Sequence, residues 1–227
     1  MKQIHMQAEP SPVDLDLTET ALIVIDMQKD FLVPGGFGAF LGNDVTLLQR
    51  TIAPLQRVFA TARALGMLII HTREGHLPDL SDCPPTKLTR WAPGTRIGDP
   101  GPMGRILIRG EEGHGIIEEV APLADEIVID KPGKNAFYAT NLGEILCEKS
   151  VKNLIVTGVT TDVCCSATVI AANDQGYNAI ILSDCVASYS PARHTAALAV
   201  IKAQGGIFGW VSDSQSFLAS VVELANV

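Results

Sequence analysis

The chain has 227 residues, with 17 Lys and Arg against 25 Asp and Glu, which gives a formal net charge of −8 at pH 7. A hydrophobic content of 47% with 19% charged residues is ordinary for a globular domain. An acidic chain without a basic patch argues against binding to nucleic acid or to an anionic membrane, and it favours a small-molecule substrate.

The N-terminal residues and the cysteines indicate the compartment. Residues 1–12 lack the apolar core of a signal peptide, and no later apolar run approaches the roughly 18 residues that span a bilayer. The cysteines are odd in number and lack C-x-x-C spacing, so we expect free thiols and a cytoplasmic protein. They are Cys83, Cys147, Cys164, Cys165 and Cys185.

The first predicted strand is the aliphatic run over residues 21–25, and it ends in Asp26. A continuous apolar run is typical of a strand that is covered on both faces. Residues 44–65 read as helix, but Pro54 interrupts them, which predicts two helices or one kinked helix.

A second strand is predicted over residues 67–72, and a long proline-rich segment follows it. Loops of this length in compact domains are usually functional. Apolar anchors such as Leu80 and Trp91 favour an ordered lid or subunit contact over residues 73–104. The prolines that exclude regular structure there are Pro78, Pro84, Pro85, Pro93, Pro100 and Pro102.

Strands and helices then alternate to the end of the chain, which predicts a doubly wound α/β fold. We expect one domain over residues 1–227, with a three-layer α-β-α architecture and a parallel sheet of about six strands. Further strands are predicted at 105–109, 126–130, 154–158, 179–182 and 207–211. Further helices are predicted at 116–120, 141–149, 166–175, 191–204 and from 212 onwards.

Three chemically complementary side chains directly follow predicted strands, and they should meet at the carboxyl edge of the sheet. They are Asp26, Lys131 and Cys164. Cys164 stands where a strand turns into a helix, where the helix N-terminus lowers a thiol pKa and backbone N–H groups can hold an oxyanion. Asp26 could take the thiol proton while Lys131 favours the thiolate, which predicts acyl transfer through a thioester.

Each of these residues also has a structural interpretation. A cysteine in such a fold is more often a small buried residue, an Asp at a strand end is often a cap, and a Lys is usually solvated. The coincidence of all three at one edge favours the functional interpretation. Neither nucleotide-binding glycine motif is present, no G-x-S-x-G elbow occurs, and His71 and His76 lack metal-site spacing.

Three segments resemble the signatures of the isochorismatase-like cysteine hydrolases. They are A-L-I-V-I-D-M-Q at 21–28, I-D-K-P-G at 129–133 and G-V-T-T-D-V-C at 158–164. The resemblance implies a Rossmann-like topology, an Asp26, Lys131 and Cys164 triad without metal or cofactor, and a cis peptide before Thr160 that shapes an oxyanion hole.

Within that superfamily, further segments such as 71–76, 130–134 and 204–209 look most like biuret hydrolase and triuret hydrolase. This resemblance implies hydrolysis of a small linear carbamoyl-urea. A small planar substrate needs several fixed polar partners. The expected substrate-binding residues are Phe31, Lys134, Thr160 and Gln204.

Other activities remain open at this point. An amidohydrolase of the same superfamily could act on an N-carbamoyl amino acid or on ureidoacrylate. A binding or redox-sensing relative could instead use Cys164 and Cys165 as an oxidisable pair. The resemblance also implies a homo-oligomer, a dimer or a tetramer.

Overall fold

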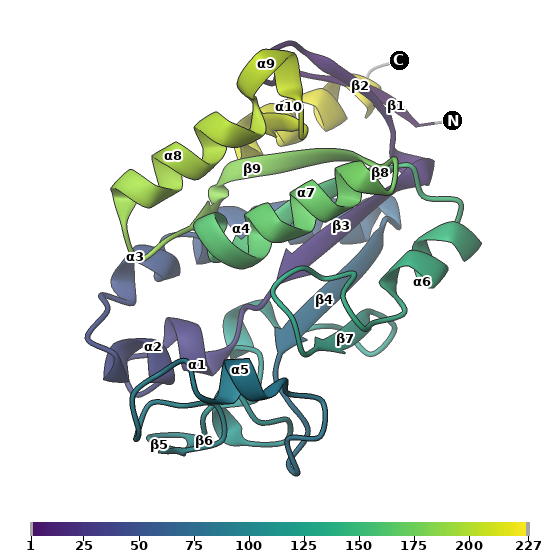
Figure 1. Ribbon diagram of the computed structural model, residues 1–227. Coiled ribbons are helices and arrows are strands. Elements are labelled where there is room, and N and C mark those ends of the chain that lie inside the picture. Colours follow the sequence, from purple (N-terminus) through teal and green to yellow (C-terminus); the bar gives the residue numbers. More distant parts are fainter. Residues whose placement is uncertain (1, 226–227) are drawn as a thin grey trace.

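Six parallel strands form the central sheet of the structure, a computed structural model that describes residues 2–225. The strand order is β10–β9–β8–β3–β4–β7 (Figure 1). The bounds are β3 (Thr20–Ile25), β4 (Leu68–Glu74), β7 (Ile127–Lys131), β8 (Asn153–Val159), β9 (Asn178–Ala187) and β10 (Trp210–Ser212). The prediction of an α/β fold with a six-stranded parallel sheet is confirmed.

The order of the strands creates a switch point between β3 and β8. From β3 the chain builds outwards through β4 to β7, and it then returns to pair β8 with the other side of β3 before continuing to β9 and β10. Ligands of doubly wound sheets bind beyond the carboxyl ends of the strands at such a reversal.

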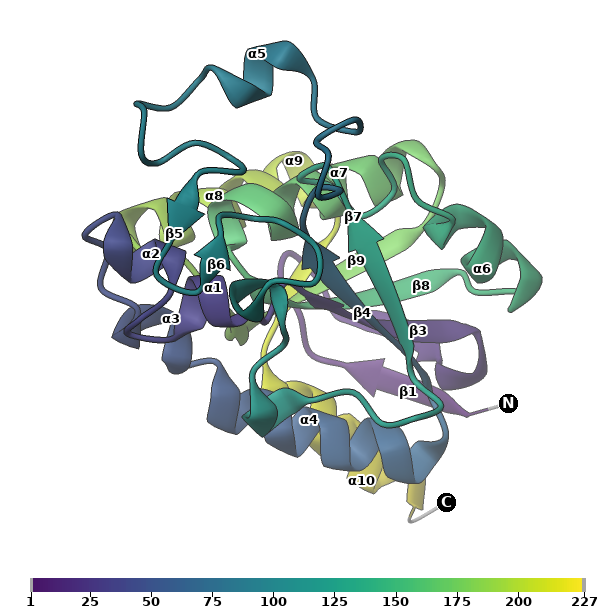
Figure 2. The same cartoon turned by 90° about the horizontal axis from the view of Figure 1, so that it is seen from below.

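Helices cover both faces of the sheet. The helices α4 (Ile52–Leu65) and α10 (Ser214–Ala225) lie together on one face, and α6 (Leu142–Glu148), α7 (Ser166–Asp174) and α8 (Pro191–Ile201) cover the other (Figures 1 and 2). Alternate residues of β3 enter the two resulting cores: Leu22 and Val24 join one, and Ala21, Ile23 and Ile25 join the other. This double burial explains the continuous apolar run.

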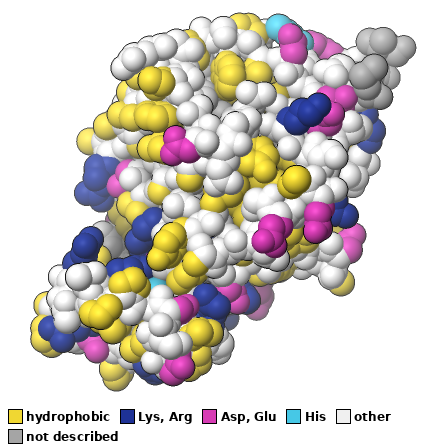
Figure 3. Space-filling model, turned by 45° about the vertical axis from the view of Figure 1, so that its right-hand side comes forward, with side chains coloured by type: hydrophobic (Ala, Val, Ile, Leu, Met, Phe, Trp, Pro, Cys, Tyr) yellow, Lys and Arg dark blue, Asp and Glu magenta, His cyan; other side chains and the backbone are white. Residues whose placement is uncertain are grey.

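Short elements occur mainly beyond the carboxyl edge. They are the helices α1 (Lys29–Leu32), α2 (Phe37–Phe40), α3 (Thr46–Gln49), α5 (Pro85–Leu88) and α9 (Ala203–Gly206), the strands β5 (Pro100–Gly101) and β6 (Gly104–Arg105), and 3₁₀ turns at Leu17–Glu19, Glu112–His114 and Glu118–Val120. The lobe that carries α5, β5 and β6 extends from the body of the molecule (Figures 2 and 3). Within the described residues, no helix is long and apolar enough to cross a bilayer.

An N-terminal hairpin was absent from the predicted elements. The strands β1 (Gln3–Met6) and β2 (Val13–Asp16) pair antiparallel, and β1 packs against α10. Each strand alternates exposed and buried residues, and this period of two was the sequence signal for it.

The predicted strand over residues 105–109 is wrong. Only Gly104–Arg105 pairs as a strand, with β5. Ile106 and Ile108 are buried with Phe37, Cys83 and Ile97 in a separate hydrophobic cluster. The apolar residues therefore form the core of the lobe, and Leu107, at φ 52°, breaks the extended backbone.

Two boundaries near the C-terminus also differ. The helix predicted over 191–204 ends at Ile201, where Lys202 leaves the helical conformation, and Gln204 and Gly205 then have left-handed φ angles of 52° and 81°. The strand predicted over 207–211 begins only at Trp210.

In the other half of the chain, Pro54 falls in the first turn of α4, after the break that separates α4 from α3, so the two-helix alternative is confirmed.

Candidate active site

Four adjacent strands each deliver one ionisable side chain to the carboxyl edge. Asp26 follows β3, Glu74 ends β4, Lys131 ends β7, and Cys164 follows β8. Ligand-type atoms of Asp26, Glu74 and Cys164 all lie within 4.8 Å of one another. The structure thus brings the three predicted catalytic residues together and adds Glu74.

Asp26 and Lys131 form a fully buried ion pair. Lys131 Nζ lies 2.7 Å from Asp26 Oδ2, and both side chains are 0% exposed. Lys131 also donates to the carbonyl oxygens of Gly133 and Lys134 at 3.0 Å each. The Thr72 hydroxyl donates to Asp26 Oδ1 at 2.7 Å. These bonds fix both charged groups, as burial of an ion pair requires.

Glu74 is the functional residue that the sequence reasoning missed. Cys164 Sγ donates to Glu74 Oε2 at 3.5 Å, and Lys134 Nζ donates to Glu74 Oε1 at 2.5 Å. Lys131 Nζ lies 4.0 Å from the same carboxylate. The predicted strand stopped at Thr72, whereas β4 continues to Glu74, so the missed signal was the acid in the segment H-T-R-E.

The two carboxylates differ in electrostatic environment. Burial raises the pKa of Asp26 above its ordinary value, despite the attraction of Lys131. Burial acts in the same direction on Glu74, but Lys134 and Lys131 together bring the pKa of Glu74 below its ordinary value. Asp26 is therefore the better proton acceptor, and Glu74 remains ionised.

The thiol and the ammonium group are both held in their protonated forms at rest. Burial raises the pKa of Cys164 well above the ordinary thiol value, and Lys131 only partly offsets it. Although burial opposes it, the negative groups around Lys131 raise its pKa above the ordinary value. The thiol is consequently neutral, and it can act as a nucleophile only after a base takes its proton.

The nucleophile sits in a tightly built turn. The peptide bond between Val159 and Thr160 is cis, as the family resemblance implied. Thr161–Cys165 forms a π-helical turn that leads directly into α7, and the Thr168 hydroxyl donates to the Cys164 carbonyl at 2.7 Å. The thiol therefore lies at the start of a helix, as expected.

Gly158 allows β8 to approach β3 at this point. Its φ is 101°, and an added Cβ atom would lie 2.0 Å from the carbonyl oxygen of Ile25. No larger residue fits so close to a neighbouring backbone. The close contact joins the strand that precedes Cys164 to the strand that precedes Asp26.

A cavity of about 480 Å³ opens above the thiol. Aromatic and aliphatic side chains form much of its wall, together with polar and charged groups such as Glu74, Lys134 and Arg193. Phe31, Lys134 and Thr160 line it, as predicted, and the Tyr189 hydroxyl donates to the Phe31 carbonyl at 2.7 Å. The other lining residues are Phe37, Gly38, Leu41, Asn43, Glu74, Trp91, Val159, Asp162, Val163, Cys164 and Arg193.

Gln204 does not lie at this cavity, so the expectation that it contacts a ligand there is corrected. It is an exposed residue of α9, between the end of α8 and the start of β10. A residue that precedes a parallel strand lies at the amino edge of the sheet, whereas Cys164 lies at the carboxyl edge.

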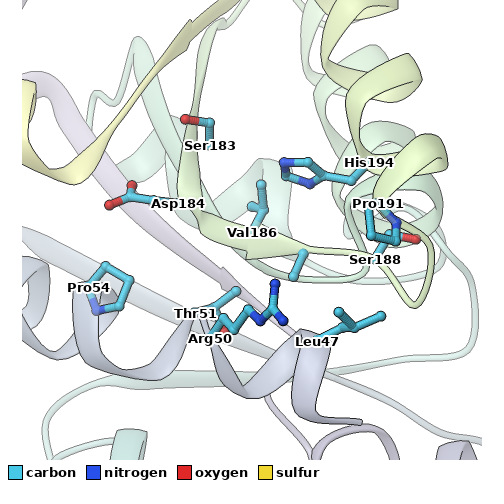
Figure 4. A pocket seen from close by; sticks show the side chains of 11 residues that line it. Leu47, Arg50, Thr51, Pro54, Ser183, Asp184, Val186, Ser188, Pro191 and His194 are labelled. Atoms are coloured by element: carbon cyan, nitrogen blue, oxygen red, sulfur yellow. The ribbon is translucent and has the colours of Figure 1, made fainter. Parts of the chain in front are cut away.

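A second cavity of about 270 Å³ lies between the α3–α4 segment and β9 (Figure 4). Its wall includes Arg50, Asp184 and His194, but no cysteine. His194 Nδ1 lies 2.9 Å from the hydroxyl of Thr161 in the nucleophile turn. This cavity lacks a thiol and the buried carboxylate–lysine cluster, so we assign the chemistry to the cavity above Cys164.

Two lysines lie beside the buried cluster of acidic and thiol groups and supply positive charge to it. Among the described residues, Asp26, Glu74 and Cys164 are the one group with metal-ligand geometry, and Lys131 and Lys134 lie against its carboxylates. The histidines considered as ligands have other partners. His71 Nε2 lies 3.0 Å from Glu126, and His76 Nδ1 lies 3.1 Å from Asp82.

Comparisons with known proteins add relatives to this geometry. The isochorismatase domain model matches residues 20–216. Ureidoacrylate amidohydrolase RutB of Yersinia enterocolitica is 31% identical over 227 residues, covering 98% of this chain and 97% of that protein. A cysteine hydrolase from Pseudomonas syringae superposes with a TM-score of 0.79 at 27% identity, over 92% of this chain and 95% of that chain. N-carbamoylsarcosine amidase of Thermoplasma acidophilum shares the fold, with a TM-score of 0.65 at 23% identity over 86% of this chain and 96% of that chain.

Proposed function

Because the chain belongs to the isochorismatase family of cysteine hydrolases, we propose that it cleaves a C–N bond in the carbamoyl group of a small ureido compound. The observation that carries the proposal is the buried Cys164 thiol, hydrogen-bonded to Glu74 at a cavity lined by both apolar and charged side chains. Ureidoacrylate is the first candidate substrate, since a ureidoacrylate amidohydrolase is a full-length relative at 31% identity. Biuret and triuret are the second candidates, since the segments at 130–134 and 204–209 resemble those of biuret hydrolase and triuret hydrolase.

Binding of the carbamoyl group prepares the thiol for attack. The ionised carboxylate of Glu74 accepts a hydrogen bond from a carbamoyl N–H group. This bond replaces the hydrogen bond that the Cys164 thiol donates to Glu74. Lys134, bonded to Glu74 at 2.5 Å, donates to a substrate carbonyl oxygen. The thiol then donates its hydrogen bond to Asp26, whose carboxylate oxygen lies within 4.8 Å of the sulfur.

Acylation follows with the proton moving through Asp26. The Cys164 sulfur forms a bond to the carbamoyl carbon as Asp26 takes the thiol proton, and the backbone of the Thr160–Cys164 turn stabilises the oxyanion. Asp26 returns the proton to the leaving nitrogen as the C–N bond breaks. Water then attacks the thioester, Asp26 accepts its proton, and the proton passes to the departing sulfur.

A lid role for the proline-rich segment is part of the same proposal. Trp91 lies in this segment, is 48% exposed and lines the cavity. We infer that its ring covers the bound ureido group and limits entry of water. Trp91→Ala should then raise KM for ureidoacrylate while leaving the fold intact by circular dichroism.

Ammonia release from a substrate panel tests the proposed function. The panel comprises ureidoacrylate, N-carbamoylsarcosine, biuret, triuret and nicotinamide. Cys164→Ser should lose turnover of every substrate, whereas Cys165→Ala, a matched change at the adjacent buried thiol, should retain it. Retained turnover in Cys164→Ser, or no turnover of any ureido substrate by the unmodified protein, contradicts the proposal.

A further inference from the structure

An exposed arginine with unused hydrogen-bond donors lines the cavity above Cys164. Arg193 lines this cavity, and its side chain is 61% exposed. Its Nε donates to Asp162 Oδ2 at 2.9 Å. Neither terminal nitrogen of Arg193 donates to another group in the described part of the chain. Guanidinium groups present several donors in a planar fork, so these nitrogens are available to a ligand.

The two lysines nearest the thiol are instead paired with its carboxylates. Lys131 is fully buried and donates to Gly133 and Lys134 while it pairs with Asp26. Lys134 pairs with Glu74 beside the thiol. Lys131 and Lys134 therefore serve the reacting group, and Arg193 is left as the cation that can contact the rest of a substrate in this cavity.

Two elements fix the position of Arg193 relative to the sulfur. It is in the first turn of α8, where Ser190 Oγ accepts from the Arg193 amide at 3.3 Å, and a helix N-terminus favours a nearby anion. Asp162, which holds the guanidinium, lies two residues before Cys164 in the same helical turn. Asp162, Cys164 and Arg193 all line the same cavity, so the guanidinium and the thiol face one ligand space.

We propose that Arg193 determines specificity by binding a carboxylate at the end of the substrate remote from the cleaved C–N bond. A guanidinium group and a carboxylate can form two parallel hydrogen bonds. Asp162 keeps the guanidinium oriented for this contact through Nε. The inference rests on the proposed ureido hydrolysis, and it favours acidic ureido compounds such as ureidoacrylate over neutral ones such as biuret.

Kinetics with a matched pair of substrates test this assignment. Ureidoacrylate and its methyl ester share the ureido group, but the ester has no carboxylate charge. Arg193→Gln should lower kcat/KM for ureidoacrylate roughly 10- to 100-fold, mainly through KM, as expected for loss of a charged hydrogen bond. The ester should be affected far less, and Arg193→Lys should be intermediate. The exposed Arg57→Gln on α4 is the control, and it should leave both substrates unaffected.

A binding measurement separates this inference from the proposed function. Calorimetric titration of Cys164→Ser with ureidoacrylate should give a Kd that rises at least tenfold when Arg193→Gln is added. Equal losses for ureidoacrylate and ester, equal Kd values, or no binding by Cys164→Ser each overturn the role of Arg193. Absence of ammonia release together with Arg193-dependent binding would refute the hydrolysis and retain the carboxylate site.

Discussion

The Cys164 thiol donates its hydrogen bond to Glu74 at 3.5 Å, although Asp26 belongs to the same cluster of side chains. Two carboxylates therefore compete for the role of base. Their environments separate them, because Lys134 and Lys131 keep Glu74 ionised while burial makes Asp26 more basic. We assign proton transfer to Asp26 and binding of the carbamoyl nitrogen to Glu74.

Asp26→Asn should reduce kcat for ammonia release by roughly 10²- to 10⁴-fold, the usual loss on removing a general base. Binding of ureidoacrylate should persist, because Asp26 is fully buried beneath the cavity and does not line it. Steady-state kinetics and calorimetry of the same preparation check both parts. A variant with normal kcat would show that Asp26 is not the proton acceptor.

Glu74→Gln should raise KM as well as lower kcat, because the amide lacks the charge that accepts the carbamoyl N–H and pairs with Lys134. We expect a fall in kcat/KM of roughly 100-fold. Glu112→Gln, which removes an exposed partner of Lys29, is the control. If Glu74→Gln instead abolished turnover while Asp26→Asn preserved it, the two roles would be exchanged.

Lys131→Met should destabilise the fold by about 3–5 kcal/mol, because it leaves the buried carboxylate of Asp26 without its partner at 2.7 Å. The double variant Asp26→Asn/Lys131→Met should recover much of this loss and remain inactive. Urea denaturation of the four proteins gives the coupling free energy. A single Lys131→Met variant as stable as the parent would contradict the importance of the pair.

Stability should fall in acid through Glu126, which immediately precedes β7 and has a side chain that is 7% exposed. Burial raises the pKa of Glu126, but bonds with Arg63, the Leu123 amide and His71 outweigh it and lower the pKa from 4.5 to about 2. A carboxyl with a depressed folded-state pKa stabilises above its unfolded pKa, so this contribution is lost as pH falls from about 4.5 to 2.

Glu126→Gln should therefore be less stable at pH 7, by up to about 3 kcal/mol, and its stability should vary less between pH 4.5 and pH 2. Urea denaturation at several pH values measures this dependence. Glu148→Gln, at an exposed position in α6, should behave like the parent protein. The same acid sensitivity in both variants would assign the effect to other groups.

The sheet and the meeting of Asp26, Lys131 and Cys164 at its edge were predictable because their signals are local. Buried parallel strands read as apolar runs, and Asp26, Lys131 and Cys164 each follow such a run closely. Glu74 was missed because a polar residue ending β4 resembles the start of a loop. The prediction for Gln204 was wrong because a residue that precedes a parallel strand lies at the amino edge of the sheet, away from Cys164. Resemblance of a sequence segment gives no information on the edge at which a residue lies. Arg193 required the fold, since its link to Asp162 spans 31 residues.

The cavity has two parts with separate origins in the chain. Its floor consists of strand ends and buried ion pairs, whose replacement disturbs folding and chemistry together. Its walls come from surface segments, including α2, the proline-rich loop with Trp91 and the start of α8. Substitutions confined to these walls can alter which compounds are accepted without touching the groups that break the bond. The scaffold is thus suited to acquiring new substrates by changes at a few surface positions.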